Sequence, residues 1–255
     1  MSSTVPVSQG TLLKYDAFNP VVRFSAYKRE GRLLLKSLQR SLNDPEAVST
    51  IQQVRDQVFQ QSSPGSRTGK AVGFAGPAGG EGATSLSVLL ALTLENVKRN
   101  RIAYLDVRME RKNFSIFTEM FALTKSPATY SAGAEVLHCY SAKNRNLSFL
   151  APATNLDTIS AFSGEDFVGL LGELRSAYDT IIFDLPAVLR SSETRMILPR
   201  LDIFYLVCAA RRTLFSDVEK AKKTVAEAGG RISGVILNRQ KAPFWTRFFG
   251  KDAFF

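Results

Sequence analysis

A glycine-rich turn at residues 76–85 carries the residue types and spacing that point to phosphate chemistry. It reads Gly-Pro-Ala-Gly-Gly-Glu-Gly-Ala-Thr-Ser and lies between a short apolar segment and a longer one that fits a helix. A strand leading through such a turn into a helix lets backbone N–H groups at the helix N-terminus hold phosphates. The lysine expected after Gly82, which would reach the β- and γ-phosphates, is Ala83. The turn therefore predicts a phosphate site without its usual lysine.

Two aspartates and an asparagine end apolar segments further along the chain. Asp106 ends IAYLD, Asp184 ends TIIFD and Asn238 ends GVILN. Ligands of parallel α/β sheets bind at the carboxyl ends of the strands, so these side chains and the glycine turn are expected at one edge of the sheet. For a single aspartate, the alternative is a strand-end residue that caps a neighbouring helix.

Six apolar segments of strand length alternate with segments of helical period. Near-continuous apolar strands separated by helices favour a parallel sheet that is covered on both faces. The sequence thus predicts a doubly wound α/β fold with a mainly parallel sheet, and no internal repeat is visible. The predicted strands are Ala71–Ala75, Ile102–Asp106, Leu147–Ala151, Thr180–Asp184, Ile203–Ala209 and Gly234–Asn238.

Helix boundaries are marked by capping residues and proline. Asp44-Pro45-Glu46 predicts a helix start, and that helix is expected to run to about Gln60. Ser163 with Asp166, and Ser216 with Glu219, resemble capping boxes. Gly229-Gly230 is expected to end the last long helix.

Length and composition favour one large α/β domain. The chain has 255 residues, is 45% hydrophobic, and contains neither a run of about 18 apolar residues nor a signal-like start, so we expect a cytoplasmic protein. The net charge of +10 permits attraction to nucleic acid or anionic lipid, or a basic surface that serves solubility alone. Cys139 and Cys208 are expected to be buried free thiols, and His138 to be structural.

The two ends of the chain differ from its centre and suggest three parts: residues 1–43, 44–240 and 241–255. Residues 20–42 are basic, with apolar residues spaced for one helical face, which suits a membrane surface, a partner helix or the protein's own domain. The last twelve residues hold six aromatics beside Arg247 and Lys251. They suit an interfacial anchor, a docking peptide or a segment that covers the core. Aromatic and basic residues together would also suit binding of single-stranded nucleic acid, but nothing else in the sequence supports that function.

Four segments in order resemble the cytoplasmic domain of bacterial tyrosine kinases (BY-kinases). They are GPAGGEGATS, IAYLDVRMERKN, YDTIIFDLPAVL and GVILNR, and the resemblance covers roughly residues 45–240. These kinases are partners of polysaccharide co-polymerases in capsule and exopolysaccharide export, and they belong to the MinD/ParA class of P-loop NTPases. The resemblance implies the fold of that class and a site for ATP or ADP, with or without Mg²⁺.

The resemblance also implies roles for individual residues. Thr84 would be the hydroxyl on Mg²⁺, and Asp106 and Asp184 would be the two Walker aspartates that hold the metal and, in an active enzyme, serve catalysis. Asn238 would meet the base. The implied nucleotide-binding set is Gly79, Gly80, Glu81, Gly82, Ala83, Thr84, Ser85, Arg108 and Asn238.

The chain departs from the family pattern at its charged positions. Ala83 replaces the loop lysine, and Arg108 replaces the second aspartate of the Asp-x-Asp motif. In the family's Glu-x-x-Arg-x-x-Arg helix, Glu46 is kept but the arginines are Ser49 and Gln52. The family's terminal tyrosine cluster is missing from the sequence, whose last tyrosine is Tyr205. The extra loop lysine of ParA-type members is also missing, since that position is Ala78.

These departures favour a non-catalytic BY-kinase-like protein that docks on a membrane polysaccharide co-polymerase (a Wzz-type chain-length protein) at the inner membrane, with self-association also open. A divergent but active tyrosine kinase or ATPase, in which Arg108 does the work of the lysine, is the alternative. A MinD/ParA-like positioning protein is the third hypothesis. Nucleic acid is not the expected partner.

Overall fold

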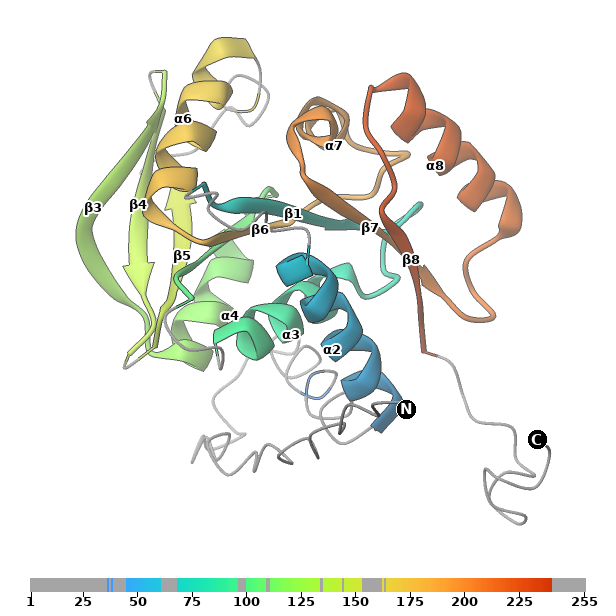
Figure 1. The fold of residues 1–255 in the computed structure, drawn as a ribbon, viewed down its shortest axis with the longest axis horizontal. Coiled ribbons are helices and arrows are strands. Elements are labelled where there is room, and N and C mark those ends of the chain that lie inside the picture. The colour runs from blue at the N-terminus through green and yellow to red at the C-terminus, as the bar shows by residue number, and fades with distance from the viewer. Residues whose placement is uncertain are drawn as a thin grey trace, which may run out of the picture.

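A computed structural model places the predicted strands in one eight-stranded sheet of order β3-β4-β5-β2-β6-β1-β7-β8 (Figure 1). It describes residues 36, 38, 45–60, 68–95, 100–108, 111–133, 135–143, 145–152, 162 and 164–239. The strands are β1 (Lys70–Ala75), β2 (Ile102–Asp106), β3 (Thr124–Ala132), β4 (Glu135–Ser141), β5 (Leu147–Pro152), β6 (Thr180–Asp184), β7 (Ile203–Ala209) and β8 (Gly234–Asn238).

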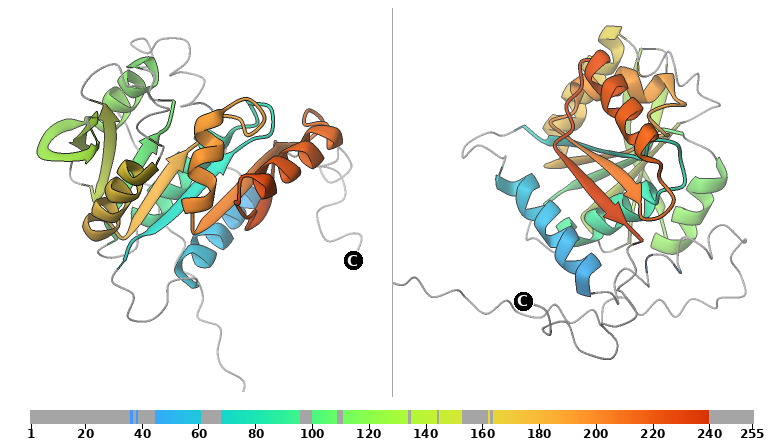
Figure 2. Two further views of the ribbon diagram at one scale, coloured as in Figure 1. Left: turned by 90° about the horizontal axis from the view of Figure 1, so that it is seen from above. Right: turned by 90° about the vertical axis from the view of Figure 1, so that its right-hand side faces the viewer.

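The helices cover both faces of this sheet, as predicted (Figures 1 and 2). On one face α2, α3 and α4 pack against the strands, and on the other face α6, α7 and α8 do so. Helix α3 is buried at every position from Leu86 to Leu94, because it lies between the sheet and α2. The helices are α2 (Pro45–Gln60), α3 (Ala83–Glu95), α4 (Arg111–Phe121), α6 (Gly164–Ala177), α7 (Ser192–Ile197) and α8 (Phe215–Glu227), and a 3₁₀ turn, η2 (Leu198–Arg200), follows α7.

All six predicted strands are confirmed, four with the expected bounds and two longer by one residue. Five neighbouring pairs among these strands are parallel, so their carboxyl ends lie at one edge. The sequence did not reveal β3 and β4. Strand β4 runs antiparallel to both neighbours, and β3 is a largely polar edge strand that contains Pro127 and an irregular register, which an edge strand tolerates.

Three helix predictions had different outcomes. Helix α2 runs from Pro45 to Gln60 as expected, with Ile51, Val54 and Val58 buried. The prediction of a capping box at Ser216 and Glu219 is wrong. Helix α8 begins at Phe215, and its N-cap residue, Leu214, makes no side-chain hydrogen bond to the helix. The predicted end of α8 is confirmed: the helix stops at Glu227, and Gly229 adopts a φ of +77° that favours glycine.

Several sequence predictions lie outside the described residues. These are the N-terminal part except Lys36 and Leu38, the side chain of Glu46, Ser163, and residues 241–255. Leu38 is buried in the same core as α2 and α3. Cys139 and Cys208 are buried and unpaired, as predicted. Within the described ranges, no helix has both the length and the apolar character needed to span a bilayer.

Candidate functional site

The glycine turn connects β1 to α3 and has the backbone shape of a phosphate-binding loop. Gly79, Gly80 and Gly82 have φ values of +101°, +83° and +100°, a region that side chains other than glycine rarely adopt. The Leu86 N–H donates to the Gly82 carbonyl at 3.1 Å, so the backbone of the loop passes directly into the first turn of α3. The predicted residues Ala83, Thr84 and Ser85 form the first turn of α3 and are half-buried.

The Glu81 carboxylate lies inside the loop and holds its first half. The side chain is buried, and it accepts hydrogen bonds from the Ala78 N–H (3.1 Å) and the Gly79 N–H (2.8 and 3.1 Å). Position 76 must be glycine, since a Cβ there would overlap the Glu81 carboxylate. The side chain of Glu81 therefore supports the loop, which leaves only its backbone to meet a ligand.

Asn238, at the end of β8, holds the second half of the same loop. Its Nδ2 donates to the Glu81 carbonyl at 2.8 Å. A Cβ at position 82 would overlap this amide, so Gly82 is required by its neighbour as well as by its φ. The expected contact of Asn238 with a base stays a prediction, because the structure shows the amide on the loop itself.

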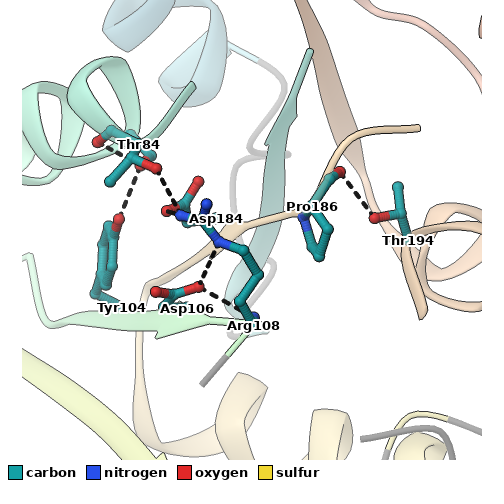
Figure 3. A network of polar contacts seen from close by, with 8 residues as sticks. Thr84, Tyr104, Asp106, Arg108, Asp184, Pro186 and Thr194 are labelled. Atoms are coloured by element: carbon teal, nitrogen blue, oxygen red, sulfur yellow. Dashed lines mark hydrogen bonds and ion pairs between the residues drawn. The ribbon is translucent and has the colours of Figure 1, made fainter. Parts of the chain in front are cut away.

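The segment after β6 fixes the loop from a third side. The N–H groups of Val188 and Leu189 donate to the carbonyls of Gly76 (3.0 Å) and Pro77 (3.1 Å). The Pro186 carbonyl accepts from the Thr194 hydroxyl at 3.0 Å, which ties the segment to α7 (Figure 3). The segment that follows Asp184 is thus bonded both to the glycine loop and to α7, and these bonds fix the position of Asp184 in the site.

Arg108 brings the three predicted metal ligands together (Figure 3). Its Nη2 lies 3.0 Å from the Thr84 hydroxyl and 3.4 Å from Oδ2 of Asp184. Its Nε lies 3.4 Å from Oδ1 of Asp106, which also accepts from the Arg108 backbone N–H at 3.0 Å. Thr84, Asp106 and Asp184 therefore converge as the sequence predicted, but they converge on a guanidinium.

The charges of this cluster act strongly on one another. Burial, with a smaller contribution from Asp106, raises the pKa of Asp184 to about 7, and Arg108 opposes the rise. Burial alone would lower the pKa of Arg108, but Asp184 and Asp106 outweigh it and raise this pKa. Below the cluster the Tyr104 hydroxyl is bonded to Ser87 at 2.9 Å, and burial raises the pKa of Tyr104 well above its usual value.

The donor set does not fit a resident Mg²⁺ ion. Magnesium requires near-octahedral oxygen ligands at about 2.0–2.1 Å, and here the guanidinium already contacts both carboxylates and the hydroxyl. Across the described ranges, no group of three or more His, Cys, Asp or Glu side chains could hold a metal ion.

Arg212 is a site residue that the sequence reasoning missed. It lies in the turn after β7, and its Nη1 donates to the Gly80 carbonyl at 3.3 Å. The turn is held by the Thr213 hydroxyl, which accepts from the Ala209 N–H at 2.8 Å. Because Arg212 closely follows the carboxyl end of a predicted strand, the rule that selected Asp106 and Asp184 could have found it.

Comparison with known proteins gives one curated relative and no matching family model. The chain is 28% identical over 89 residues to CapB of Staphylococcus aureus, which is assigned as a tyrosine-protein kinase. The match covers 34% of this chain and spans only 39% of CapB.

Solved structures share the fold of this chain. The VpsO kinase domain superposes with a TM-score of 0.59 at 23% identity, covering 81% of this chain and 97% of that domain. The chimerical protein CapA2B2 superposes with a TM-score of 0.62 at 17% identity, covering 81% and 91%. The resemblance to bacterial tyrosine kinase domains and the doubly wound fold that it implied are thus confirmed.

Proposed function

We propose that this protein is a non-catalytic relative of the bacterial tyrosine kinase domains and serves capsule or exopolysaccharide production. It would dock on the cytoplasmic side of a membrane polysaccharide co-polymerase and bias the conformation of that partner. The observation that carries the proposal is the guanidinium of Arg108 between Thr84, Asp106 and Asp184, where phosphoryl transfer needs a metal ion.

The magnitude of the lost charges supports absence of turnover. Removing one preorganised donor from a transition state costs about 2.7–4 kcal/mol, or about 10²–10³ in rate. Here Ala83 removes the loop lysine, and Arg108 removes one carboxylate and contacts the remaining two. Two such losses at one site would leave phosphoryl transfer without its main sources of charge stabilisation.

Two residues outside the site also support a non-catalytic protein. Ser49 is exposed on α2, where the family carries an arginine of its ring-forming motif. Tyr205, the last tyrosine of the sequence, is buried, and its hydroxyl donates to Gln57 at 2.7 Å. This tyrosine is thus unsuited to accept a phosphoryl group from a neighbouring subunit.

Nucleotide can still bind in this proposal. The glycine loop keeps its backbone shape, and Arg108 and Arg212 lie on either side of it. ATP or ADP would then act as a structural ligand that the protein holds without turning it over.

The test is a turnover assay on the full chain with labelled ATP and Mg²⁺. We expect hydrolysis and phosphotransfer no higher than those of an Asp184→Asn variant. Turnover clearly above that control would reject the proposal. Docking is tested separately by deleting the gene and measuring the chain length of the exported polysaccharide, which should change.

A divergent active enzyme is the second candidate, and the position of Arg108 favours it. The guanidinium is 38% exposed and reaches the first turn of α3, so it could meet a phosphate in place of the lysine. In that case Arg108→Ala would abolish a measurable turnover of the wild-type protein. Turnover that survives this substitution would exclude the second candidate.

A further inference from the structure

The guanidinium of Arg108 occupies the place where a divalent cation would be held. It touches one hydroxyl from the first turn of α3 and one carboxylate from the end of each of the two strands β2 and β6. These are the oxygen atoms that the fold offers to a metal (Figure 3). A planar fork with five N–H donors can satisfy several such oxygens at once.

The charge of the cluster supports this substitution. Counted with both aspartates ionised, the two carboxylates and the guanidinium that contacts them carry a net charge of minus one. Three carboxylates around a divalent ion would carry the same net charge. Exchanging a carboxylate and a metal ion for one arginine therefore keeps the electrostatic balance around the buried Asp184.

We propose that Arg108 is a permanent substitute for the divalent cation, so that the loop binds the phosphates of a nucleoside diphosphate without metal. The inference rests on the proposed function, since it gives the ligand and the metal requirement of the same site. It is independent of whether the protein docks on a co-polymerase.

The remaining donors of Arg108 can meet a phosphate. The contacts with Asp106, Thr84 and Asp184 use Nε and Nη2, and the side chain is 38% exposed. Nη1 is therefore the group that can turn to a ligand above the loop. On the opposite side, Arg212 lies beside Gly80 and adds a second cation.

A metal ion could enter only by displacing Arg108. The side chain of Asp184 is 1% exposed, and its Oδ1 has no hydrogen-bond partner among the described residues. A free ion would have to replace the contacts of Arg108 with Thr84 and Asp106 as well as its contact with Asp184, and Arg108 is the one cation paired with Asp184 in those ranges. The structure thus favours the guanidinium over an exchangeable ion.

The test is calorimetric titration of the full chain with ADP, in excess EDTA and in excess MgCl₂. We expect the dissociation constant of the wild-type protein to differ less than about threefold between the two buffers. Binding that weakens by about tenfold or more in EDTA, equivalent to about 1.4 kcal/mol, would overturn the inference. Absence of ADP binding in both buffers would overturn it too, while leaving the non-catalytic docking proposal in place.

Variants make the test specific to the guanidinium. Arg108→Asp restores the second carboxylate, and its affinity for ADP should become about tenfold or more dependent on Mg²⁺. Arg231→Asp makes the same charge change at an exposed position before β8, and it should retain the metal-independent binding. Thermal unfolding of each variant shows whether it is folded. If Arg108→Asp does not fold, the wild-type titrations still decide the question.

Discussion

The glycine loop and the neighbouring carboxylate cluster differ in how closely they match the bacterial tyrosine kinase pattern. The loop keeps its left-handed glycines and is bonded on three sides by Glu81, Asn238 and Val188. The cluster has the two aspartates of that pattern, but Arg108 stands where the pattern has a second carboxylate, and it contacts both aspartates. The shape of the loop depends on contacts within the protein, and these three contacts do not involve Arg108.

The strongest test of this comparison is to restore the chemistry on the existing loop. Ala83→Lys combined with Arg108→Asp returns the loop lysine and the second carboxylate. Because the backbone already has the required shape, we expect Mg²⁺-dependent ATP hydrolysis at least about 100-fold above the wild-type rate. Labelled-phosphate release measures it, and adding Asp184→Asn should abolish the gain. No gain in a folded double variant would show that the loop has also lost its function.

A side chain at position 82, in the second half of the loop, should destabilise the protein. Gly82→Ala places a Cβ against Asn238 at a φ of +100°, and we expect a loss of about 2–3 kcal/mol in the free energy of unfolding. Gly172→Ala is the matched control, since this glycine lies exposed in α6 with no atom within 4 Å of the added Cβ. The free energy of unfolding of that control should rise by about 0.5–1 kcal/mol. Denaturant unfolding measures both, and equal effects would contradict the account of the loop.

The contribution of the Arg108 cluster to the stability of the protein should depend on pH. Because the folded pKa of Asp184 is raised to about 7, stability from its protonated form is present below about pH 4 and is lost as pH rises through 7. Arg108 lowers this pKa, so Arg108→Ala should cost little at low pH and more at high pH. We expect about 1–2 kcal/mol near pH 8, a value reduced for the partial exposure of the guanidinium.

Unfolding curves across this pH range measure the effect of Arg108→Ala. In an Asp184→Asn background, the same substitution should lose most of its pH dependence. A cost that is equal at low and high pH in both backgrounds would mean that Arg108 acts through packing and not through charge.

The smallest effect on stability is expected from a substitution of Tyr104, below the Arg108 cluster. Tyr104→Phe removes the hydroxyl that is bonded to Ser87, while the ring keeps its contacts with Phe117 and Phe149. Ser87 still donates to the Thr84 carbonyl, so no donor is orphaned. We expect a loss of about 0.5–1.5 kcal/mol in the free energy of unfolding. A larger loss, or a change in ADP affinity, would show that Tyr104 takes part in the site itself.

The sequence predicted the central sheet well because its strands are continuous apolar runs that end in polar residues. Strands β2, β6 and β8 have the expected bounds for this reason, and β7, which ends at Ala209, also has them. The hairpin of β3 and β4 escaped prediction, since its edge strand is largely polar and contains a proline. Apolar runs reveal the parallel strands, including β8 at one edge, but the largely polar β3 at the other edge gives no such signal.

The sequence predicted that Thr84, Asp106 and Asp184 lie close together, but it predicted neither Arg212 nor the contacts of the site. The convergence of Asp106, Asp184 and Thr84 follows from parallel strand topology, which the sequence reveals. The inward position of Glu81 and the bridging position of Arg108 depend on side-chain conformations and on three separate elements. No spacing rule along the chain specifies them, and they decide what the site can hold.

Asn238 gives the protein a mechanical linkage at the point where β8 ends. One amide donates to the Glu81 carbonyl at 2.8 Å and accepts from the Arg239 N–H at 2.8 Å. The same side chain therefore connects the end of β8 to the glycine loop, so a shift of β8 at Asn238 would move the loop with it.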